Sequence, residues 1–224
     1  MAGRKGLYRI FLMNLSGKDP NDRWNEAAFN EVGDRVQAHF QRVIAHPACP
    51  FTSVRWFPGH AGMILDPDEL LVYFVASYRS SVIEAAGGRL KDTTFMKEGG
   101  ATWESRNGMI SEVWLDGSPL KAANPLSDGD YQKLFANTAF HELMHNKLDS
   151  QTRGAVLNDL HTEGGGGLAD QNFTAGTRPT DKNIELMAKN LARPIPQNTA
   201  AANVSMVLMD GMPVLIDDGK APTP

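Results

Sequence analysis

The spacing of hydrophobic and polar residues predicts a mixture of strands and helices in the first part of the chain. Residues 7–15 alternate loosely and are rich in strand-forming side chains, so they predict a strand. Residues 24–44 carry apolar side chains three or four positions apart, which is the period of one face of a long helix. Asp19 and Asn21 precede this stripe and are candidate caps for its N-terminus.

Further apolar runs predict more strands in the middle of the chain. Residues 52–57 form a short strand-like run, and residues 70–78 form a continuous apolar run typical of a central strand buried on both faces. Residues 81–90 predict a short helix or turn, whereas residues 92–108 are polar and rich in glycine and predict a loop. Residues 109–115 predict another strand.

A second long helix is predicted for residues 130–148. Neither proline nor glycine interrupts this stretch, and Ser127 or Asp128 can cap its N-terminus. Residues 149–180 then predict irregular structure. They include four consecutive glycines, residues 164–167, which mark either a flexible backbone or one that another segment approaches closely.

The end of the chain predicts one more helix and a hairpin. Thr180 or Asp181 can cap an amphipathic helix, and residues 203–218 hold two apolar runs around Asp210 and Gly211, a typical hairpin turn. No internal repeat and no strong linker divides the sequence, so we expect a single α+β domain over residues 1–224.

Charge and composition narrow the classes of function. The 224 residues include 22 basic and 26 acidic side chains spread along the sequence, a net charge of −4, which argues against a nucleic-acid partner. No apolar run approaches the length of a membrane span, and residues 1–17 lack the cleavage site of a signal peptide. We therefore expect a cytoplasmic protein, or one exported without a conventional signal peptide. The single cysteine, Cys49, excludes an intrachain disulfide and predicts a buried apolar residue.

The strongest chemical signal is the stretch AFHELMHNKLDS, residues 139–150, inside the second predicted helix. His141 and His145 are four positions apart, so both rings lie on one helix face, about 6 Å apart, and can bind one metal ion. Glu142 is rotated round the helix from His141. It can take a proton from a metal-bound water, whose pKa a zinc ion lowers from about 15.7 to about 7. The spacing therefore predicts a catalytic metal site with its general base.

The motif HELMH, with the order of elements before it, resembles the HExxH zinc metallopeptidases called zincins. The resemblance implies a zincin-like α+β fold, in which a mixed twisted sheet has a long backing helix and an active-site helix. It divides the domain into an N-terminal subdomain, residues 1–148, and a smaller C-terminal subdomain, residues 149–224. It also implies that His141 and His145 bind Zn²⁺ and that Glu142 is the general base.

The same resemblance implies where a substrate binds. In zincins an extended peptide lies along an edge strand of the sheet by strand addition, which places a peptide or protein substrate beside residues 109–115. Two positions depart from the metzincin branch, because Leu148 and Gln151 stand where that branch has a glycine and a third histidine. The chain is therefore not a standard metzincin, and we expect its helix to run on instead of turning sharply at Leu148.

The third metal ligand has four candidates, which are Asp149, His161, Glu163 and Glu185. Asp149 follows His145 by four positions and suits a hydrogen bond to a ligand histidine better than a bond to the metal. His161 and Glu163 lie beside the four glycines, in a segment long enough to fold back. Glu185 lies on a later helix, as the third ligand of the gluzincin branch does, but in a different local sequence. We predict His161, with the two glutamates as alternatives.

The predicted activity is zinc-dependent hydrolysis of peptide bonds, in which Glu142 takes a proton from water and passes it to the leaving amine. The alternative is a non-catalytic binding or structural protein whose helix serves zinc-stabilised folding, because a structural site needs no base and closes its coordination with four protein ligands. Tyr131 and His60 could stabilise an oxyanion, but helix packing and a loop position suit them better. Trp103 and Trp114 could line a cleft, but core packing suits them better.

Overall fold

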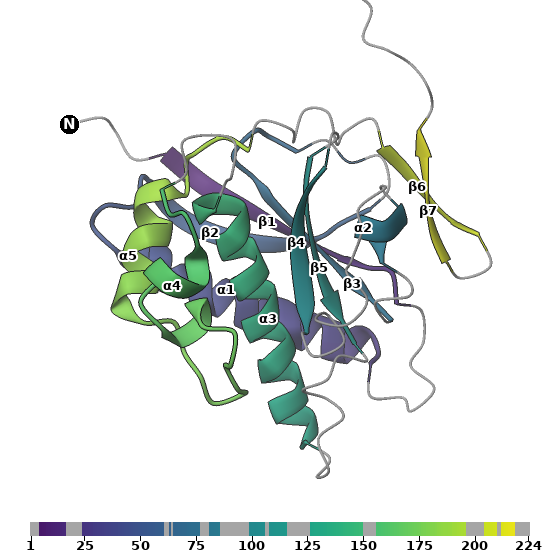
Figure 1. The fold of residues 1–224 in the computed structure, drawn as a ribbon, viewed down its shortest axis with the longest axis horizontal. Helices are drawn as coiled ribbons and strands as arrows, with labels where there is room; N and C mark the ends of the chain where they lie inside the picture. Colours follow the sequence, from purple (N-terminus) through teal and green to yellow (C-terminus); the bar gives the residue numbers. More distant parts are fainter. Residues whose placement is uncertain are drawn as a thin grey trace, which may run out of the picture.

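A computed structural model of the chain describes residues 5–16, 24–60, 63, 65–76, 81–85, 99–105, 108–115, 126–149, 156–195, 204–209 and 212–217. Within these ranges a mixed five-stranded sheet lies beside two long helices (Figure 1). The predicted α+β class is therefore confirmed.

The sheet is mostly parallel, with one antiparallel strand at an edge. The strand order is β2-β1-β3-β5-β4, in which only β4 runs antiparallel to its neighbour. The strands are β1 Lys5–Asn14, β2 Phe51–Pro58, β3 Leu70–Val75, β4 Gly100–Ser105 and β5 Gly108–Trp114. β3 lies at the centre of the sheet, as its continuous apolar run predicted.

The position of β4 corrects two predictions. Residues 100–105 belong to the predicted loop 92–108, yet they form a strand that pairs with β5 along its whole length. Consequently β5, predicted as the edge strand over residues 109–115, lies inside the sheet, and β4 takes the edge. Backbone groups make the pairing, so glycine and polar residues can form this strand without an alternating apolar pattern. Residues 92–98 lie outside the described part of the chain.

The first long helix, α1, spans Glu26–Ala45. Asn25 caps it, because its side-chain oxygen accepts a hydrogen bond from the backbone N–H of Ala28 at 3.0 Å. The predicted caps Asp19 and Asn21 lie outside the described residues. The helix therefore begins later than the apolar stripe suggested.

The second long helix, α3, spans Asp128–Leu148, and Ser127 caps its N-terminus as predicted. The expectation that this helix runs on instead of turning at Leu148 is wrong. Asp149 adopts an extended backbone, and the N–H of Leu157 donates to the C=O of Leu148 at 3.2 Å. Asp149, the first residue after the helix, forms an isolated parallel bridge with Leu157.

Shorter elements complete the main body. They are α2 Val82–Ala85, α4 Leu160–Glu163, the 3₁₀ helix η4 Gly167–Ala169 and α5 Asp181–Asn190. α4 and η4 lie in the stretch predicted to be irregular. α5 is the predicted amphipathic helix, and Thr180 caps it in a capping box.

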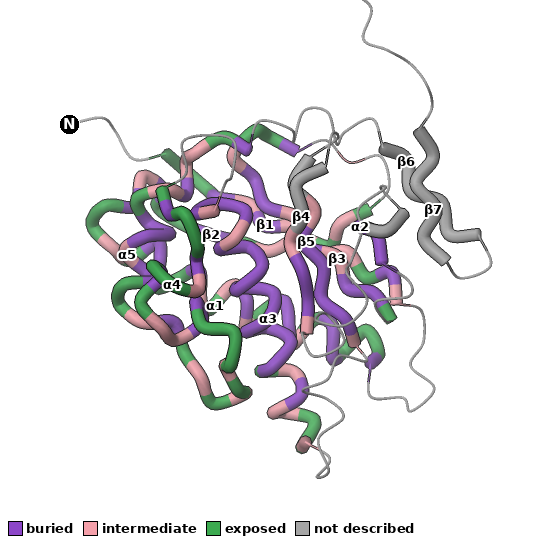
Figure 2. The backbone as a smooth tube through the Cα atoms, in the orientation of Figure 1, coloured by how far each residue is buried: buried purple, intermediate pink, exposed green. Residues whose placement is uncertain are grey.

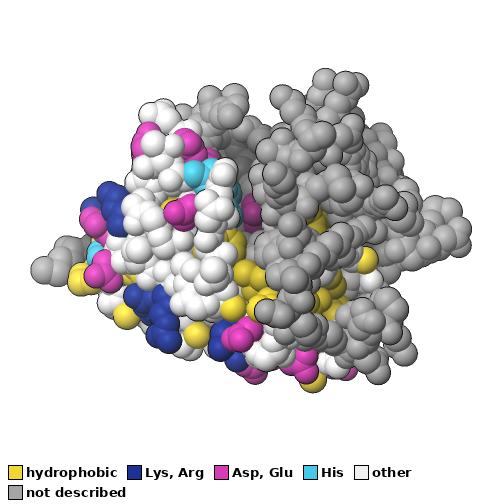
Figure 3. Space-filling view, turned by 60° about the horizontal axis from the view of Figure 1, so that its bottom comes forward, with side chains coloured by type: hydrophobic (Ala, Val, Ile, Leu, Met, Phe, Trp, Pro, Cys, Tyr) yellow, Lys and Arg dark blue, Asp and Glu magenta, His cyan; other side chains and the backbone are white. Residues whose placement is uncertain are grey.

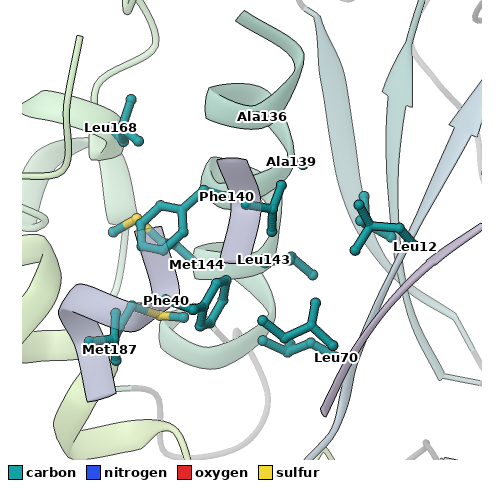
Figure 4. Close-up of a cluster of buried hydrophobic side chains, with 14 of the residues drawn as sticks. Leu12, Phe40, Leu70, Ala136, Ala139, Phe140, Leu143, Met144, Leu168 and Met187 are labelled. Carbon is teal, nitrogen blue, oxygen red and sulfur yellow. The ribbon is translucent and has the colours of Figure 1, made fainter. Parts of the chain in front are cut away.

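The helices cover the sheet unequally. α1 and α3 pack on one face, and α2 lies on the other (Figure 1). Leu12 of β1, Phe40 of α1 and Phe140 of α3 belong to the hydrophobic cluster between these layers (Figure 4). The two phenylalanine rings meet edge to face, with centroids 5.1 Å apart. Cys49 joins the same cluster and is 2% exposed, as predicted for a buried thiol.

α3 is enclosed along most of its length. Among residues 131–148 only Gln132, Lys133 and His145 are not buried (Figure 2). Lys147 is buried as well, and its amine donates to the backbone carbonyls of Asp68 at 2.6 Å and Arg193 at 2.8 Å. The HELMH motif, residues 141–145, therefore lies on a helix that other elements hold in place from several sides.

The C-terminal hairpin is confirmed as a separate two-stranded sheet. β6 Val204–Met209 pairs antiparallel with β7 Met212–Asp217, and the pairing continues to Met209 and Met212 on either side of the predicted turn. In the part of the chain that the structure describes, no helix is long and apolar enough to cross a membrane.

Candidate metal centre

Three histidines from two helices meet at one point. The Nε2 atoms of His141 and His145, both on α3, are 3.0 Å apart. His161, on the short helix α4, brings its Nε2 to 3.3 Å from that of His141. One nitrogen from each of the three rings lies within 4.8 Å of the others. The three residues predicted to bind the metal are thus brought together.

The spacing of these nitrogens fits a zinc ion. Tetrahedral coordination with Zn–N bonds of 2.0–2.1 Å separates neighbouring ligand nitrogens by about 3.3 Å. The observed separations of 3.0 and 3.3 Å are close to that value. The side chains of His145 and His161 are 16% and 28% exposed, so solvent reaches the cluster. Histidine side chains are visible on the face shown in Figure 3.

The opposite nitrogens of the α3 histidines have fixed partners. The Nδ1 of His141 donates to the backbone carbonyl of Leu168 at 2.6 Å, and because a carbonyl only accepts, the Nε2 of His141 presents its lone pair to the centre. The Nδ1 of His145 bonds to the carboxylate of Asp149, the role predicted for that residue. Such partners set the tautomer and orientation that a metal ligand needs.

His161 is held from its own segment. Asp159 caps α4, where its carboxylate accepts from the backbone N–H of His161 at 3.0 Å and lies 3.4 Å from the ring Nδ1. The side-chain amide of Gln171 lies 3.2 Å from the same ring nitrogen. The orientation of the third histidine therefore depends on residues 159–171 and not on the sheet.

Burial and charge act differently on the three rings. Burial, together with the neighbouring His145, lowers the pKa of His141 and of His161 below the ordinary value. Burial acts in the same direction on His145, but its hydrogen bond to Asp149 and the negative charge of Glu142 outweigh it and raise the pKa of His145. Two of the rings are therefore held neutral, which is the state that binds metal.

Glu142 lies at the contact between α3 and the sheet and is 5% exposed. The hydroxyl of Thr102, on β4, donates to Oε2 of its carboxylate at 2.8 Å and lies 2.9 Å from its backbone carbonyl. Ser111, on β5, donates to the same carbonyl at 3.1 Å, and Asn146 donates to the Ser111 hydroxyl. Side chains from two strands thus fix the position of the predicted base.

A glycine permits this close contact. A Cβ at Gly100, the first residue of β4, would lie 2.5 Å from the backbone oxygen of Glu112, 3.0 Å from Thr138 and 3.1 Å from the Cγ of Glu142. Sequence reasoning missed Gly100 and, with it, the strand that carries Thr102. Asn146 had a visible signal, because it follows Glu142 by four positions on the same face of the helix.

The four glycines form an ordered turn behind the histidines. Asn183, on α5, donates to the carbonyls of Gly164 at 2.8 Å and Gly166 at 3.1 Å, and its oxygen accepts from the N–H of Leu168 at 3.1 Å. Leu168 is the residue whose carbonyl accepts from His141. Of the two sequence-based readings of the glycines, close backbone approach is correct.

The alternative third ligands lie elsewhere. Glu163 is exposed and accepts from the side chain of Asn158 at 3.1 Å. Glu185 forms an ion pair with Lys189 along the surface of α5. Neither belongs to the cluster around His141.

The weaker candidates also lie away from it. Tyr131 is ten residues before His141, about 15 Å along the helix at 1.5 Å per residue, and packs edge to face on Phe135. His60 is exposed after β2. Trp114 is buried on the other face of the sheet, where its indole donates to Glu112 at 2.8 Å. The side chain of Trp103 lies outside the described part of the structure.

Comparison of the chain with protein-family models, with curated proteins and with solved structures found no match. The residues of the site and their arrangement therefore carry the functional information. That arrangement joins a three-histidine cluster, reached by solvent, to a buried glutamate on the same helix.

Proposed function

We propose that the chain is a zinc-dependent peptidase with a zincin-like fold. His141, His145 and His161 hold the zinc ion, and Glu142 is the general base. One observation carries the proposal: the Nε2 of His141 lies at zinc-ligand spacing from the Nε2 atoms of both His145 and His161, and the next residue is a glutamate whose carboxylate a strand hydroxyl holds in place.

Zinc and the side chains of the site have separate roles in the proposed reaction. When bound, zinc supplies Lewis-acid chemistry, which polarises a carbonyl and makes water more acidic. Imidazole ligands, which bind metal in the neutral form, add no negative charge that would weaken this effect. Glu142 accepts a proton from water and delivers it to the leaving amine, while Thr102 keeps the carboxylate in one orientation.

The edge strand supports a peptide as the substrate. β4 is the edge of the sheet beside Glu142, and Thr102 connects the two directly. An extended peptide can add to such an edge through backbone hydrogen bonds and so lie across the metal centre. The substrate strand proposed here is β4, in place of the strand over residues 109–115 expected from the sequence.

The ligand set favours catalysis over the structural alternative. A structural zinc site closes with four protein ligands, whereas a catalytic site uses three and keeps one position open. The described residues provide three histidines in one group, two of them partly exposed. A base placed beside the first ligand serves no purpose in a purely structural site.

The test compares two glutamates of the same chain. Glu142→Gln should keep about one zinc per chain, measured by elemental analysis, and lose hydrolysis by about 10²–10⁴-fold, because an amide cannot accept the proton. Glu163→Gln is the matched control, since Glu163 is exposed and outside the cluster. Hydrolysis is followed as new amino groups released from a mixture of unstructured peptides.

Two results would decide against the proposal. Near-normal turnover by Glu142→Gln would remove this residue as the base. A parent chain that binds zinc tightly but cleaves none of the peptides would favour the alternative, a zinc-stabilised binding or structural protein.

A further inference from the structure

A second site lies near the metal centre. It is bounded by residues 173–179, which cover part of α3 and are called the covering segment below. A cavity of about 370 Å³ opens between α1, the first half of α3 and residues 175–179. Its lining includes four basic side chains, which are Arg35, Arg42, Lys133 and Arg178. No acidic side chain is among the described residues that line it. Lys and Arg side chains also gather toward the lower part of the face shown in Figure 3.

The basic side chains are only loosely neutralised. Arg35 pairs with Glu31 at 2.7 Å and Lys133 with Asp130 at 2.9 Å, both between partly exposed side chains on one helix. Arg42 donates to the backbone carbonyl of Pro179 at 3.0 Å and lies 4.0 Å from the exposed carboxylate of Asp181. Surface pairs of this kind contribute about 0–1 kcal/mol, so a bound anion can replace them. The buried Nε of Arg35 has no hydrogen-bond partner in the described part of the chain.

The neighbouring histidine reports the positive potential. His39 lines the cavity, and its Nε2 donates a hydrogen bond to the side-chain oxygen of Asn137 at 3.0 Å. Burial lowers its pKa to about 4, and the positive charges of Arg42, Arg178 and Arg35 act in the same direction. Three guanidinium groups therefore act together at this point.

We propose that this cavity binds a small polyanion of the phosphate type. Guanidinium groups present paired N–H donors that match the oxygens of phosphate, and such charge-assisted hydrogen bonds are among the strongest in proteins. Arg35, Arg42 and Arg178 reach the cavity from α1 and from the covering segment, so an anion between them closes the two together. The site does not depend on the chain being a peptidase.

The covering segment also touches the metal centre. Asn137 donates to the carbonyls of Thr174 at 2.8 Å and Thr177 at 3.0 Å, one helical turn before His141. The ring of Phe173 lies 5.2 Å from that of His141. An anion that braces residues 174–179 therefore restrains the segment that packs against a metal ligand.

The experiment uses pyrophosphate as the probe and calorimetric titration as the measurement, on zinc-loaded and zinc-free chain. One pyrophosphate should bind per chain in both forms. Arg178→Gln should weaken binding by about 10-fold or more, the cost of one charge-assisted contact. Arg178 is exposed, so the loss is not expected to come from unfolding. Arg55→Gln is the matched control, because Arg55 is an exposed arginine on β2 outside the cavity.

A second readout follows His39 directly. Pyrophosphate should raise its pKa from about 4, seen by NMR of the ring protons, because the anion offsets the arginine charges. Equal weakening by Arg55→Gln and Arg178→Gln would mean non-specific attraction and overturn the proposal. Binding that disappears on zinc removal and ignores Arg178→Gln would place the anion on the metal and overturn it as well.

Discussion

The proposed metal centre joins two regions built in opposite ways. α3 is buried from nearly every side and carries His141 and His145, whereas residues 156–180 lie near the surface and carry His161. The first region lies within the hydrophobic core along most of its length. The second anchors Leu157, Leu160, Leu168 and Ala169 in the same core but is otherwise held by caps, a glycine turn and side-chain hydrogen bonds. Two of the proposed ligands are therefore fixed by the buried helix, and the third depends on local contacts that can open independently.

The largest expected effect separates the ligands by region. His141→Ala should lower zinc affinity by more than about 100-fold, because even partners outside the coordination shell are worth 10–100-fold. His161→Ala should lower it on the order of 10-fold or more. Competition with a coloured chelator measures the zinc dissociation constants of both variants. Equal losses would show that the surface segment holds its ligand as firmly as α3 does.

The next effect tests the hydrogen bonds that order the surface region. Asn183→Ala removes the side-chain bonds to Gly164, Gly166 and Leu168, and the capping bond from the N–H of Thr180. It should cost about 1–3 kcal/mol of stability and about 10-fold in zinc affinity. Asn190→Ala is the matched control on the same helix, because the side chain of Asn190 donates to a carbonyl of α5 itself, that of Leu186. Denaturant unfolding and metal competition provide the two measurements. An unchanged zinc affinity in Asn183→Ala would show that the glycine turn does not affect metal binding by His141.

Metal removal should affect the two regions unequally. After treatment with a chelator, amide hydrogen exchange should become several-fold faster in residues 156–180 and change little in α3, since ligand binding stabilises most what opens most easily. Mass spectrometry of peptides from the exchanged protein resolves the two regions. Faster exchange along α3 would mean that the core also relies on the metal.

The last effect is seen only in acid. His39 contacts Phe140 of α3 and has a pKa of about 4 in the folded chain, below that of an unfolded histidine. Between about pH 6.5 and pH 4 the unfolded state therefore binds more protons than the folded state. The stability that His39 provides above this window, up to about 3 kcal/mol, is lost as the pH falls through it. Between pH 7 and pH 4, His39→Gln should lose less of its stability than the parent chain does. His60→Gln, altered in an exposed loop, should behave like the parent.

The sequence predicted the parts of the molecule whose signal is local. The helix with its two histidines and glutamate followed from a spacing of four, and the caps Ser127 and Thr180 followed from residue type. β4 did not follow, because it is recognisable only by its pairing with β5. Thr102 therefore stayed hidden, although it holds the proposed base.

The cavity was hidden for a related reason. Its basic residues are spread from position 35 to position 178, so no run or stripe of charge appears along the sequence. The overall charge of −4 argued only against a nucleic-acid partner and gave no sign of a local basic site. Folding, and not composition, gathers these side chains into one place.

The backbone at three of the four glycines has the opposite handedness to that of ordinary L-residues. Gly165, Gly166 and Gly167 have φ angles of +83°, +69° and +63°, so the backbone there turns in the sense that suits D-amino acids. A side chain at Gly167 would also collide with Thr180, at 2.6 Å, whereas one at Gly166 would meet nothing within 4 Å. Chirality is thus the whole constraint at Gly166. A semisynthetic chain with D-alanine there should keep its zinc, and one with L-alanine should bind it less well.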